Sequence, residues 1–555
     1  TAMPRRPSFS ARLAALILPV ALLAACGGPP STPKSPVREL PAPAYSLLAQ
    51  APSMYGSAAP IALPEDQGSA AAQATFASLA GSKAVHEPSL DLVAAVVGKT
   101  FAQEEELPAD ALLQWLYWKC GATSVPGPVN VLVAPEGSEG YFQEHMQRLA
   151  AIVASVDSTI SFGVSRTNVM GYVAQTIALG FRPADVAPIP KSHAPGASVP
   201  VRIKPRKPYA NLMLYVDQGG PNVTATPMRQ EPDGSFSGEA ALPSVPGRYF
   251  TEVVGVDLPA DGDVEKGWRV SMVWVPLHVG VAEPAAPDDF IRRPQKNHPD
   301  KARWPVQIIN AYNDARGALG RAPLSFEAEA TELAQARSEE LSGLSTTPPP
   351  ELGLYGKFAD AGLPVRNLFG YVDQIEYVSE YITLRLLRPA ARFAIFDPSM
   401  TTLALGISPK KVPPGPAFHT SVEYVFAKIK VDPPKERARI LSELDAAEIA
   451  AGGNAFTVSE PLSAGAQAIV DEVCRGGPTP KDAQKVFARV NGLDPALRRR
   501  GAVPWLGYDL TKEEVVKVHE KVKTERYTHA GVGICQGTVE GHKGAIMALV
   551  LFAGP

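Results

Sequence analysis

The residues best suited to chemistry in this chain are three histidines near its C-terminal end. His519, His529 and His542 are separated by 10 and 13 positions (529 − 519 and 542 − 529). Imidazole binds zinc and serves as a general base, but such a site needs further ligands at a fixed spacing, and these histidines have none. His519 falls in the charged run 512–523, which favours the surface. We therefore expect solvated histidines and no bound metal, the alternative being a metal site in this part of the chain.

Other chemical signatures are absent from the sequence. It contains no nucleophile elbow, phosphate-binding loop or metalloprotease helix, so we expect no cofactor and no catalytic residue. The formal net charge of −3 excludes a general basic field for nucleic acid. The basic run 498–500 is either the solvated end of a helix, which we favour, or a contact for anionic lipid or glycan.

The elements that would position these residues form a repeated unit. Residues 304–341 have the periodicity of two amphipathic helices separated by Gly320. A shift of 132 positions (440 − 308) superposes this stretch without a gap on a later one. The residues that then coincide are Ile308 with Ile440, Ala315 with Ala447, Gly320 with Gly452, Ala334 with Ala466 and Glu340 with Glu472.

A looser copy lies near the front, where Gly81 separates two helix-like runs. Each copy also closes on a strand with a central glycine, which is Gly163, Gly406 or Gly533. The helix-breaking glycine precedes the strand glycine by 82, 86 and 81 positions (163 − 81, 406 − 320 and 533 − 452). We therefore predict three tandem α+β domains, at 65–185, 304–430 and 435–555.

The pattern of these domains resembles the CAP superfamily of cysteine-rich secretory, antigen 5 and pathogenesis-related 1 proteins, also called SCP domains. Asn313, Arg316, Gly320, Leu324 and Ala334 match the opening motif of that family. The likeness is best over residues 300–430, weaker over 435–555 and weakest over 65–180. It implies tandem CAP-like α/β/α sandwich domains.

The resemblance also implies a cavity lined by two histidines and two acidic residues, which this chain lacks where it matches best. Arg388-Pro-Ala-Ala-Arg392 stands where the family has Ser-Pro-Gly-His-Arg, so Ala391 replaces the second histidine. Residues 344–350 hold no histidine, and Arg366-Asn367-Leu368 replaces the usual Gly-Glu-Asn. Alanine neither ligates a metal nor transfers a proton.

The remaining segments have other compositions. Residues 27–64 are rich in proline and predict an extended tether, and residues 283–303 predict a linker. Residues 197–282 alternate short apolar runs with Asp-Gly and Pro-Gly turns, which predicts an inserted immunoglobulin-like β-sandwich. The joint between the last two CAP-like domains is short, so we expect those two to pack as a pair.

The first 26 residues have the pattern of a targeting segment. Arg5, Arg6 and Arg12 precede an apolar run that is too short to span a membrane, and Leu23-Ala24-Ala25-Cys26 resembles a bacterial lipobox. The resemblance implies cleavage before Cys26 and diacylglycerol on its sulfur, with an ordinary secretory signal as the alternative. Gly27 in place of aspartate implies sorting to the outer membrane.

The other cysteines are Cys120, Cys474 and Cys535. Export to an oxidising compartment permits pairing. Cys474 ends a helix and Cys535 follows the glycine strand of the same domain, so they form a disulfide or remain as two buried thiols. We expect Cys120 to be buried beside Trp115 and Trp118.

These features together predict a lipid-anchored protein of the bacterial envelope whose degenerate CAP-like domains are non-catalytic binding or scaffold modules. Its partners would be the membrane through Cys26 and an envelope protein, glycan or lipid. The alternative is a metal-dependent envelope hydrolase or a lipid- or sterol-binding protein.

The lipid anchor is directly testable. Each buried CH₂ of an acyl chain contributes about 0.8 kcal/mol, so two or more chains hold a protein on a membrane stably. Cys26→Ser should therefore release the protein from isolated membranes into the soluble fraction. Retention of the variant on membranes after an alkaline wash would contradict the assignment of Cys26.

Overall fold

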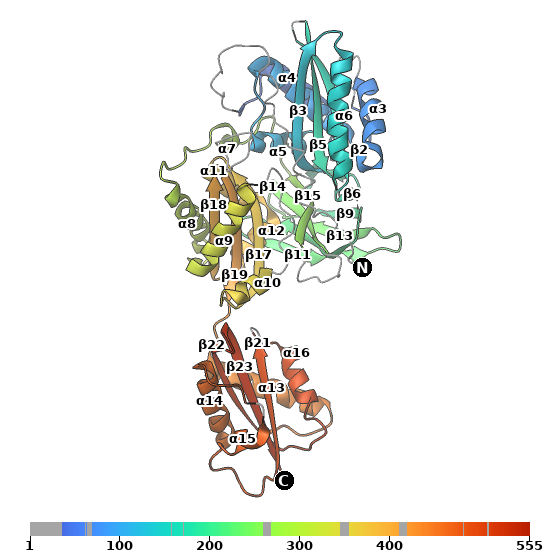
Figure 1. The fold of residues 1–555 in the computed structure, drawn as a ribbon. Coiled ribbons are helices and arrows are strands. Elements are labelled where there is room, and N and C mark those ends of the chain that lie inside the picture. Colours follow the sequence, from blue (N-terminus) through green and yellow to red (C-terminus); the bar gives the residue numbers. More distant parts are fainter. Residues whose placement is uncertain are drawn as a thin grey trace, which may run out of the picture.

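The computed structural model describes residues 36–555 except 62, 64–68, 157, 170, 259–267, 344–353, 410–418, 481 and 508–509. The fold class is α+β, as the sequence predicts, and the repeat is its basic unit. Three four-stranded sheets share one topology, with orders β2-β4-β5-β3, β16-β18-β19-β17 and β20-β22-β23-β21. In each sheet a very short parallel strand is followed by a long antiparallel hairpin and an edge strand. The tandem repetition that the glycine spacing predicts is present in the structure (Figure 1).

The first repeat contains α3 (Ser69–Ala80), β2 (Ala84–His86), α4 (Pro88–Glu104), α5 (Asp110–Lys119), β3 (Val125–Pro135), α6 (Glu139–Ser155), β4 (Ile160–Val169) and β5 (Tyr172–Phe181). The second contains α8 (Trp304–Gly317), β16 (Ser325–Phe326), α9 (Ala328–Ser342), α10 (Leu354–Asp360), β17 (Val365–Ile375), α11 (Val378–Leu387), α12 (Pro389–Phe396), β18 (Thr402–Pro409) and β19 (His419–Lys428). The third contains α13 (Pro433–Ala450), β20 (Thr457–Val458), α14 (Glu460–Cys474), α15 (Ala483–Phe487), β21 (Arg499–Gly507), α16 (Lys512–Glu520), β22 (His529–Val539) and β23 (His542–Gly554).

Each sheet buries both of its faces, which makes each repeat an α/β/α sandwich. In the second repeat, one core holds Ile308 and Tyr312 of α8 with residues of α11 and α12, and the other holds Ala330 and Ala334 of α9. The first and third repeats likewise have two cores each. Helices on both faces explain why the strands carry nearly continuous apolar runs rather than alternating ones.

The strand glycines are the points where a helix lies closest to the sheet. A Cβ atom built on Gly163, Gly406 or Gly533 would lie closer than 3.0 Å to the backbone of α4, α9 or α14. A real side chain cannot occupy that space, so the glycines are required by the packing.

A side chain next to each of these contacts completes the hydrogen bonding of the strand. The N–H after the glycine donates to Asp91 in the first repeat (2.9 Å), to Gln335 in the second (3.0 Å) and to Gln467 in the third (3.1 Å). These amides lie beyond the end of the short parallel strand and have no strand partner on that side. A buried N–H needs an acceptor, and the helix supplies it.

A β-sandwich lies between the first two repeats and holds a core of its own. Its five-stranded sheet has the order β11-β10-β14-β15-β8 and its four-stranded sheet the order β12-β13-β9-β6. The strands are β6 (Ala184–Val186), β8 (Ser192–His193), β9 (Ser198–Pro205), β10 (Tyr209–Asp217), β11 (Val223–Pro227), β12 (Arg229–Gln230), β13 (Phe236–Ala241), β14 (Gly247–Asp257) and β15 (Trp268–Val279). The sandwich thus begins at Ala184, earlier than position 197 expected from the alternating pattern.

The described part of the proline-rich segment is packed, which corrects the prediction of an extended tether over 27–64. Residues 36–61 contain α2 (Ala42–Leu47), a 3₁₀ turn (Leu48–Gln50) and β1 (Met54–Tyr55), which pairs with β7 (Ile189–Pro190) of the sandwich region. Leu40, Ala44 and Leu47 are buried in the core of the first repeat. The high proline content concealed this helical spacing, in which Pro41 precedes α2 as its N-cap residue.

The segment 283–303 is also packed rather than free. Glu283 bonds to Lys119 of the first repeat, and Ile291 of the short helix α7 (Asp289–Arg292) is buried in the core of that repeat. Asn297 receives the N–H of Val378 at the start of α11 (2.8 Å). The first repeat, the sandwich and the second repeat therefore form one packed body.

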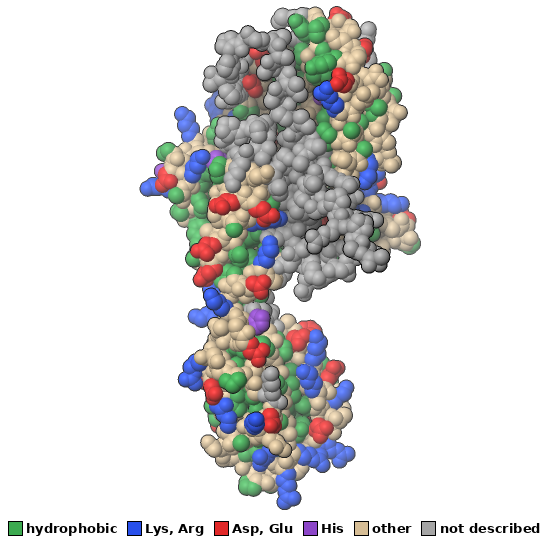
Figure 2. Space-filling model, viewed as in Figure 1, with side chains coloured by type: hydrophobic (Ala, Val, Ile, Leu, Met, Phe, Trp, Pro, Cys, Tyr) green, Lys and Arg blue, Asp and Glu red, His purple; other side chains and the backbone are tan. Residues whose placement is uncertain are grey.

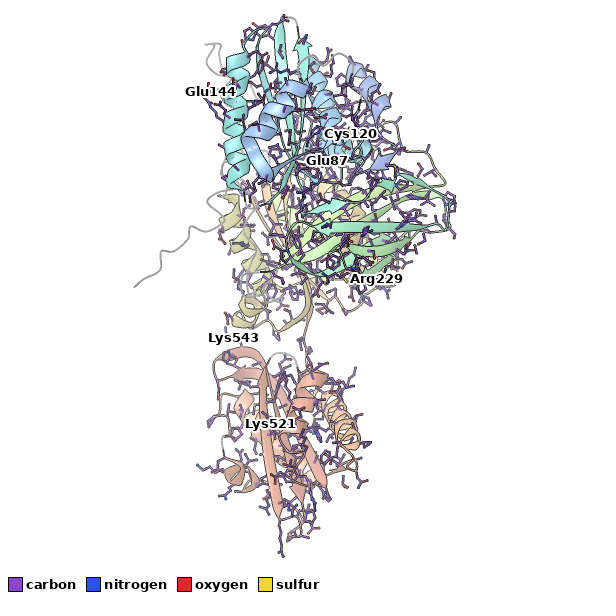
Figure 3. The ribbon with its side chains drawn as sticks, turned by 90° about the vertical axis from the view of Figure 1, so that its right-hand side faces the viewer. Glu87, Cys120, Glu144, Arg229, Lys521 and Lys543 are labelled. Carbon is purple, nitrogen blue, oxygen red and sulfur yellow. A yellow bond between two sulfur atoms is a disulfide. The ribbon has the colours of Figure 1, made fainter. Side chains whose placement is uncertain are left out.

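The last repeat stands apart from this body, which corrects the expectation that the last two repeats pack as a pair (Figure 1). Its joint is narrow. Gln536 bonds to the backbone of Ile429 (3.0 Å) and Val431 (3.0 Å), and Lys543 of β23 contacts Gly362 beyond α10 (Figure 3). The second repeat instead packs on the sandwich, where α12 contacts β10, β11 and β14.

The close helix–strand contact predicts that adding one methyl group changes the stability in opposite directions at two glycines. Gly406→Ala should lower the free energy of unfolding by about 3 kcal/mol, because the backbone of α9 cannot move away without opening the core. Gly317→Ala in α8 is the matched control, since no atom lies within 4 Å of a Cβ placed there, and it should raise stability by about 0.5–1 kcal/mol. Chemical denaturation measures both, and equal effects would contradict the packing.

Candidate functional site

A group of buried polar and charged side chains lies on the face of the second sheet that packs against α8 and α11. Glu423 of β19 is fully buried, and its Oε2 accepts hydrogen bonds from Tyr312 of α8 (3.0 Å) and Tyr381 of α11 (2.7 Å). Arg385 of α11 approaches the same oxygen at 4.0 Å and reaches Asp373 at 3.4 Å. Three helical residues thus converge on one carboxylate from the strand.

The environment fixes the protonation of this network. Burial raises the pKa of Tyr312 and Tyr381, and the nearby Glu423 raises it further. Burial alone would lower the pKa of Arg385, but Tyr381, Glu423 and Asp373 together raise it. The phenols therefore stay protonated and the guanidinium stays charged over the whole physiological range.

This network is closed to solvent except at Asp373. Asp373 is half exposed at its outer end, while Arg385 and Glu423 are almost or fully inaccessible. A general base must reach the proton that it abstracts in a substrate, whereas Glu423 is fully buried and its Oε2 already accepts hydrogen bonds from Tyr312 and Tyr381. The network fills the interior of the repeat that matches the CAP pattern best.

The segment expected to carry the second histidine of a CAP site is occupied by an interdomain contact. Ala391 is fully buried in α12. On either side of it, Arg388 pairs with Glu252 of the sandwich (2.6 Å) and Arg392 with Asp217 (2.8 Å). Arg392 also donates to the carbonyl of Gly220.

A hydrogen bond and an aromatic contact add to these ion pairs. The N–H of Ala390 donates to the second oxygen of Glu252 (3.0 Å), and the ring of Phe393 meets Tyr215 edge-on. Glu252 itself is fully buried. Sequence reasoning missed this site, although a glutamate in the apolar run of β14 was a signal that a cation would reach it from another domain.

The three histidines of the last repeat do not come together. His519 is buried and its Nε2 lies 2.6 Å from Glu448 of α13, which corrects the expectation that it is on the surface. His529 bonds to Thr528 at the start of β22, and His542 lies at the turn beyond its other end. Ten residues of strand separate these two ends by about 33 Å. Among the described residues, no three His, Cys, Asp or Glu side chains are grouped as metal ligands.

A second histidine–carboxylate pair occurs in the first repeat. Nε2 of His86 lies 2.7 Å from Asp91, whose other oxygen accepts the N–H of Val164. Asp91 is thus already committed to holding α4 on β4. Both pairs tie a helix to its surroundings.

The cysteines fall into two classes. Cys474 of α14 and Cys535 of β22 are joined by a disulfide that closes a loop of 61 positions. Cys120 is free and buried in the same core as Trp115, whereas Trp118 belongs to the core of the sandwich. Burial raises the pKa of the Cys120 thiol to about 12 (Figure 3). Such a thiol is protonated and unreactive. Cys26, the expected lipidation site, lies outside the described residues.

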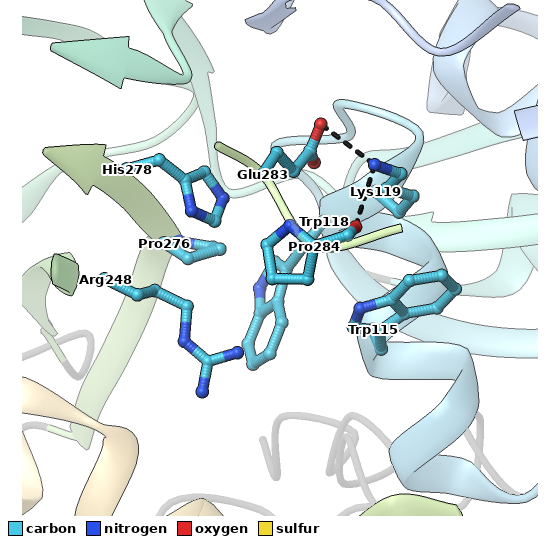
Figure 4. A pocket seen from close by; sticks show the side chains of 8 residues that line it. All are labelled: Trp115, Trp118, Lys119, Arg248, Pro276, His278, Glu283 and Pro284. Atoms are coloured by element: carbon cyan, nitrogen blue, oxygen red, sulfur yellow. Dashed lines mark hydrogen bonds and ion pairs between the residues drawn. The ribbon is translucent and has the colours of Figure 1, made fainter. Parts of the chain in front are cut away.

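A polar hollow marks the seam between the first repeat and the sandwich (Figure 4). Lys119 pairs with Glu283 (3.1 Å), and Lys191 bonds to Glu283 (3.1 Å) and to the carbonyl of Lys119 (2.6 Å). The hollow has a volume of about 10 Å³, enough for about one water molecule. It is therefore too small for a substrate.

The indole of Trp118 is the apolar anchor of this seam. It packs against Phe250 and Trp274, and its Nε1 donates to the carbonyl of Trp274 (2.8 Å). Trp115 lines the hollow, as does His278. Burial lowers the pKa of His278 to about 4, so this side chain is neutral at physiological pH.

Comparisons with known proteins give only distant neighbours. No protein-family model and no curated protein matches the chain. An outer surface protein of Borrelia burgdorferi is 10% identical at a TM-score of 0.19 and aligns over 24% of this chain and 100% of its own. An extracellular SCP-domain protein of Bacillus anthracis is 12% identical at 0.20, over 33% and 65% of the two chains. A cysteine-rich secretory protein of Staphylococcus aureus is 10% identical at 0.20, over 56% and 89%.

These weak neighbours are SCP-domain and surface proteins, and at such scores the family of this chain stays a resemblance. Within the part of the chain that the structure describes, each helix is too short or too polar to cross a bilayer.

The interdomain ion pair predicts a large loss of stability. Arg388→Ala leaves Glu252 buried without its cation and should lower the free energy of unfolding of the body by about 3 kcal/mol. Arg229→Ala is the control, because Arg229 pairs with Glu231 on the exposed rim of the sandwich and should cost nothing measurable (Figure 3). Similar denaturation midpoints for the two variants would contradict a stabilising role of the buried ion pair.

The seam predicts a pH dependence. The pKa of His278 is lowered from 6.5 to about 4 by burial, with Glu283 opposing and Arg248, Lys191 and Lys119 adding to the shift. The unfolded chain therefore binds this proton more readily, so His278 destabilises the folded state as the pH falls from 6.5 towards 4. His278→Gln should show a shallower loss of stability over this range than the unchanged protein, whereas His542→Gln on an exposed turn should not. Parallel curves for all three proteins would rule out this role.

Proposed function

We propose that the protein is an exported, lipid-anchored component of the bacterial cell envelope, sorted to the outer membrane, whose three repeats are non-catalytic binding or scaffold modules. The observation that carries the proposal is the docking of α12. Ala391 stands where the family resemblance implies a histidine, and Arg388 and Arg392 on either side of it are bound to carboxylates of the sandwich.

Two further observations support a binding role over catalysis. The buried carboxylate of Glu423 in the second repeat is bound by side chains of the same repeat, since Tyr312 and Tyr381 both donate to it. In the two histidine–carboxylate pairs, the imidazole of His86 bonds to one oxygen of Asp91, and that of His519 to one oxygen of Glu448. Losing a general base or a metal ligand costs a factor of about 10²–10⁴ in rate, so losing several leaves no useful activity.

The experiment that tests this proposal is a calorimetric titration of the purified, anchor-free protein with zinc and calcium. We expect no stoichiometric uptake at micromolar concentrations, because the described residues assemble no group of ligands. Uptake of one ion per chain that is abolished by His519→Ala or by His529→Ala would overturn the proposal in favour of a metal-dependent enzyme.

A further inference from the structure

The hollow at the seam between the first repeat and the sandwich is lined by a buried histidine with an unpaired nitrogen. His278 is only 2% exposed, and its Nδ1 has no hydrogen-bond partner within the part of the chain that the structure describes. Buried polar atoms are normally paired, either with protein or with a bound molecule. The hollow is the space from which a bound molecule would reach this nitrogen (Figure 4).

Arg248 lies beside His278 and lines the same space. The two residues are cross-strand partners on β14 and β15, so their Cβ atoms lie about 4.5–5.5 Å apart on one face of the sheet. Figure 4 shows both side chains extending from the sandwich into the hollow. One terminal nitrogen of Arg248 pairs with Asp288 (2.7 Å), and the guanidinium has further N–H donors besides. A ligand that accepts hydrogen bonds can therefore contact donors on both strands.

The charges that meet at this seam do not balance. The ion pairs among the described residues here involve the cations Lys119, Lys191 and Arg248 and the carboxylates Glu283 and Asp288. Glu283 is shared, because its Oε2 lies 3.1 Å from Lys119 and its Oε1 3.1 Å from Lys191. It neutralises one of these two lysines, so the group as a whole keeps one positive charge.

This excess charge lies where water screens it poorly. Lys191 is 2% exposed and the side chain of Lys119 is 12% exposed. On the last repeat, by contrast, basic and acidic side chains are interspersed on the solvent-facing surface (Figure 2). A buried charge without a counter-charge is unfavourable, and apolar walls such as Trp115 and Trp118 strengthen its attraction for an anion.

The field of these cations acts on His278 itself. Burial lowers the pKa of His278, Glu283 raises it, and Arg248, Lys191 and Lys119 lower it again. Three cations and one carboxylate thus act on the imidazole that lacks a partner. Their combined effect is a positive potential in the hollow.

The size of the hollow restricts its occupant to a single small particle. Its volume of about 10 Å³ suits one water molecule or one monatomic ion of similar size. A water molecule would pair with Nδ1 of His278 but would leave the positive charge uncompensated. A monovalent anion does both, since N–H groups of Arg248 and His278 can donate to it and its charge offsets the excess.

We propose that this hollow is a binding site for one monovalent anion of the size of chloride, held by Nδ1–H of His278 and by Arg248 in the field of Lys119 and Lys191. The anion joins the sandwich strands β14 and β15 to α5 of the first repeat and to the segment that follows β15. The site goes beyond the proposed function and does not depend on it, because it lies inside the body and concerns how two of its parts are held together.

The first test is anomalous diffraction from crystals of the purified protein soaked in sodium bromide, since bromide replaces chloride and is located by its anomalous scattering. We expect a bromide in the hollow, in contact with His278 and Arg248. His278→Leu removes the donor and should lose this peak, whereas His542→Leu on the exposed turn of the last repeat should keep it. A hollow that contains only water, with bromide elsewhere as an adventitious ion only, would overturn the inference.

The second test is chemical denaturation of the full chain at pH 7 in sodium chloride and in sodium gluconate at equal ionic strength. An ion that binds only the folded state stabilises it, and gluconate is too large for the hollow. The midpoint in chloride relative to gluconate should be higher for the unchanged protein and for His542→Leu than for His278→Leu, because the general effect of each salt is common to all three. The same chloride effect in all three proteins would contradict the site. If His278→Leu does not fold, the bromide-soaked crystals of the unchanged protein still decide.

Discussion

The contact of one helix with one strand glycine is the constraint on which every repeat depends. At Gly163, Gly406 and Gly533 the helix backbone lies where a side chain would otherwise be, and the adjacent Asp91, Gln335 or Gln467 receives the next N–H of the strand. The contact therefore fixes both the distance and the register between helix and sheet. The opposite face of the sheet is free to differ between repeats.

That freedom is visible in how the first helix of each repeat is tied down. In the second repeat Arg316 donates to the carbonyls of Ala322, Ile395 and Met400. In the third, the corresponding position is Glu448, which bonds to His519. Opposite charges thus hold equivalent helices, and both residues are used for packing. The arginines of α12 in the second repeat likewise serve packing, because they bind carboxylates of the sandwich.

Much of the local architecture could be predicted from the sequence, because it depends on short-range patterns. The helix-ending glycines, Gly81, Gly320 and Gly452, all adopt positive φ, and their spacing to the strand glycines reports the shared fold. What could not be predicted depends on contacts between distant segments. Arg388 and Glu252 are 136 positions apart, and nothing in the local periodicity of either segment indicates the other. The burial of His519 was missed for the same reason, since its charged helix has one inward face.

Amide hydrogen exchange of α12 tests the central claim most directly, namely that this segment is a permanent interface and not a lid over an open site. The account predicts that the amides of 392–396 exchange about as slowly as the sheet core around Val422 and Val425, and that Glu252→Ala accelerates them selectively. Fast exchange of α12 in the unchanged protein, with the sheet still protected, would contradict it.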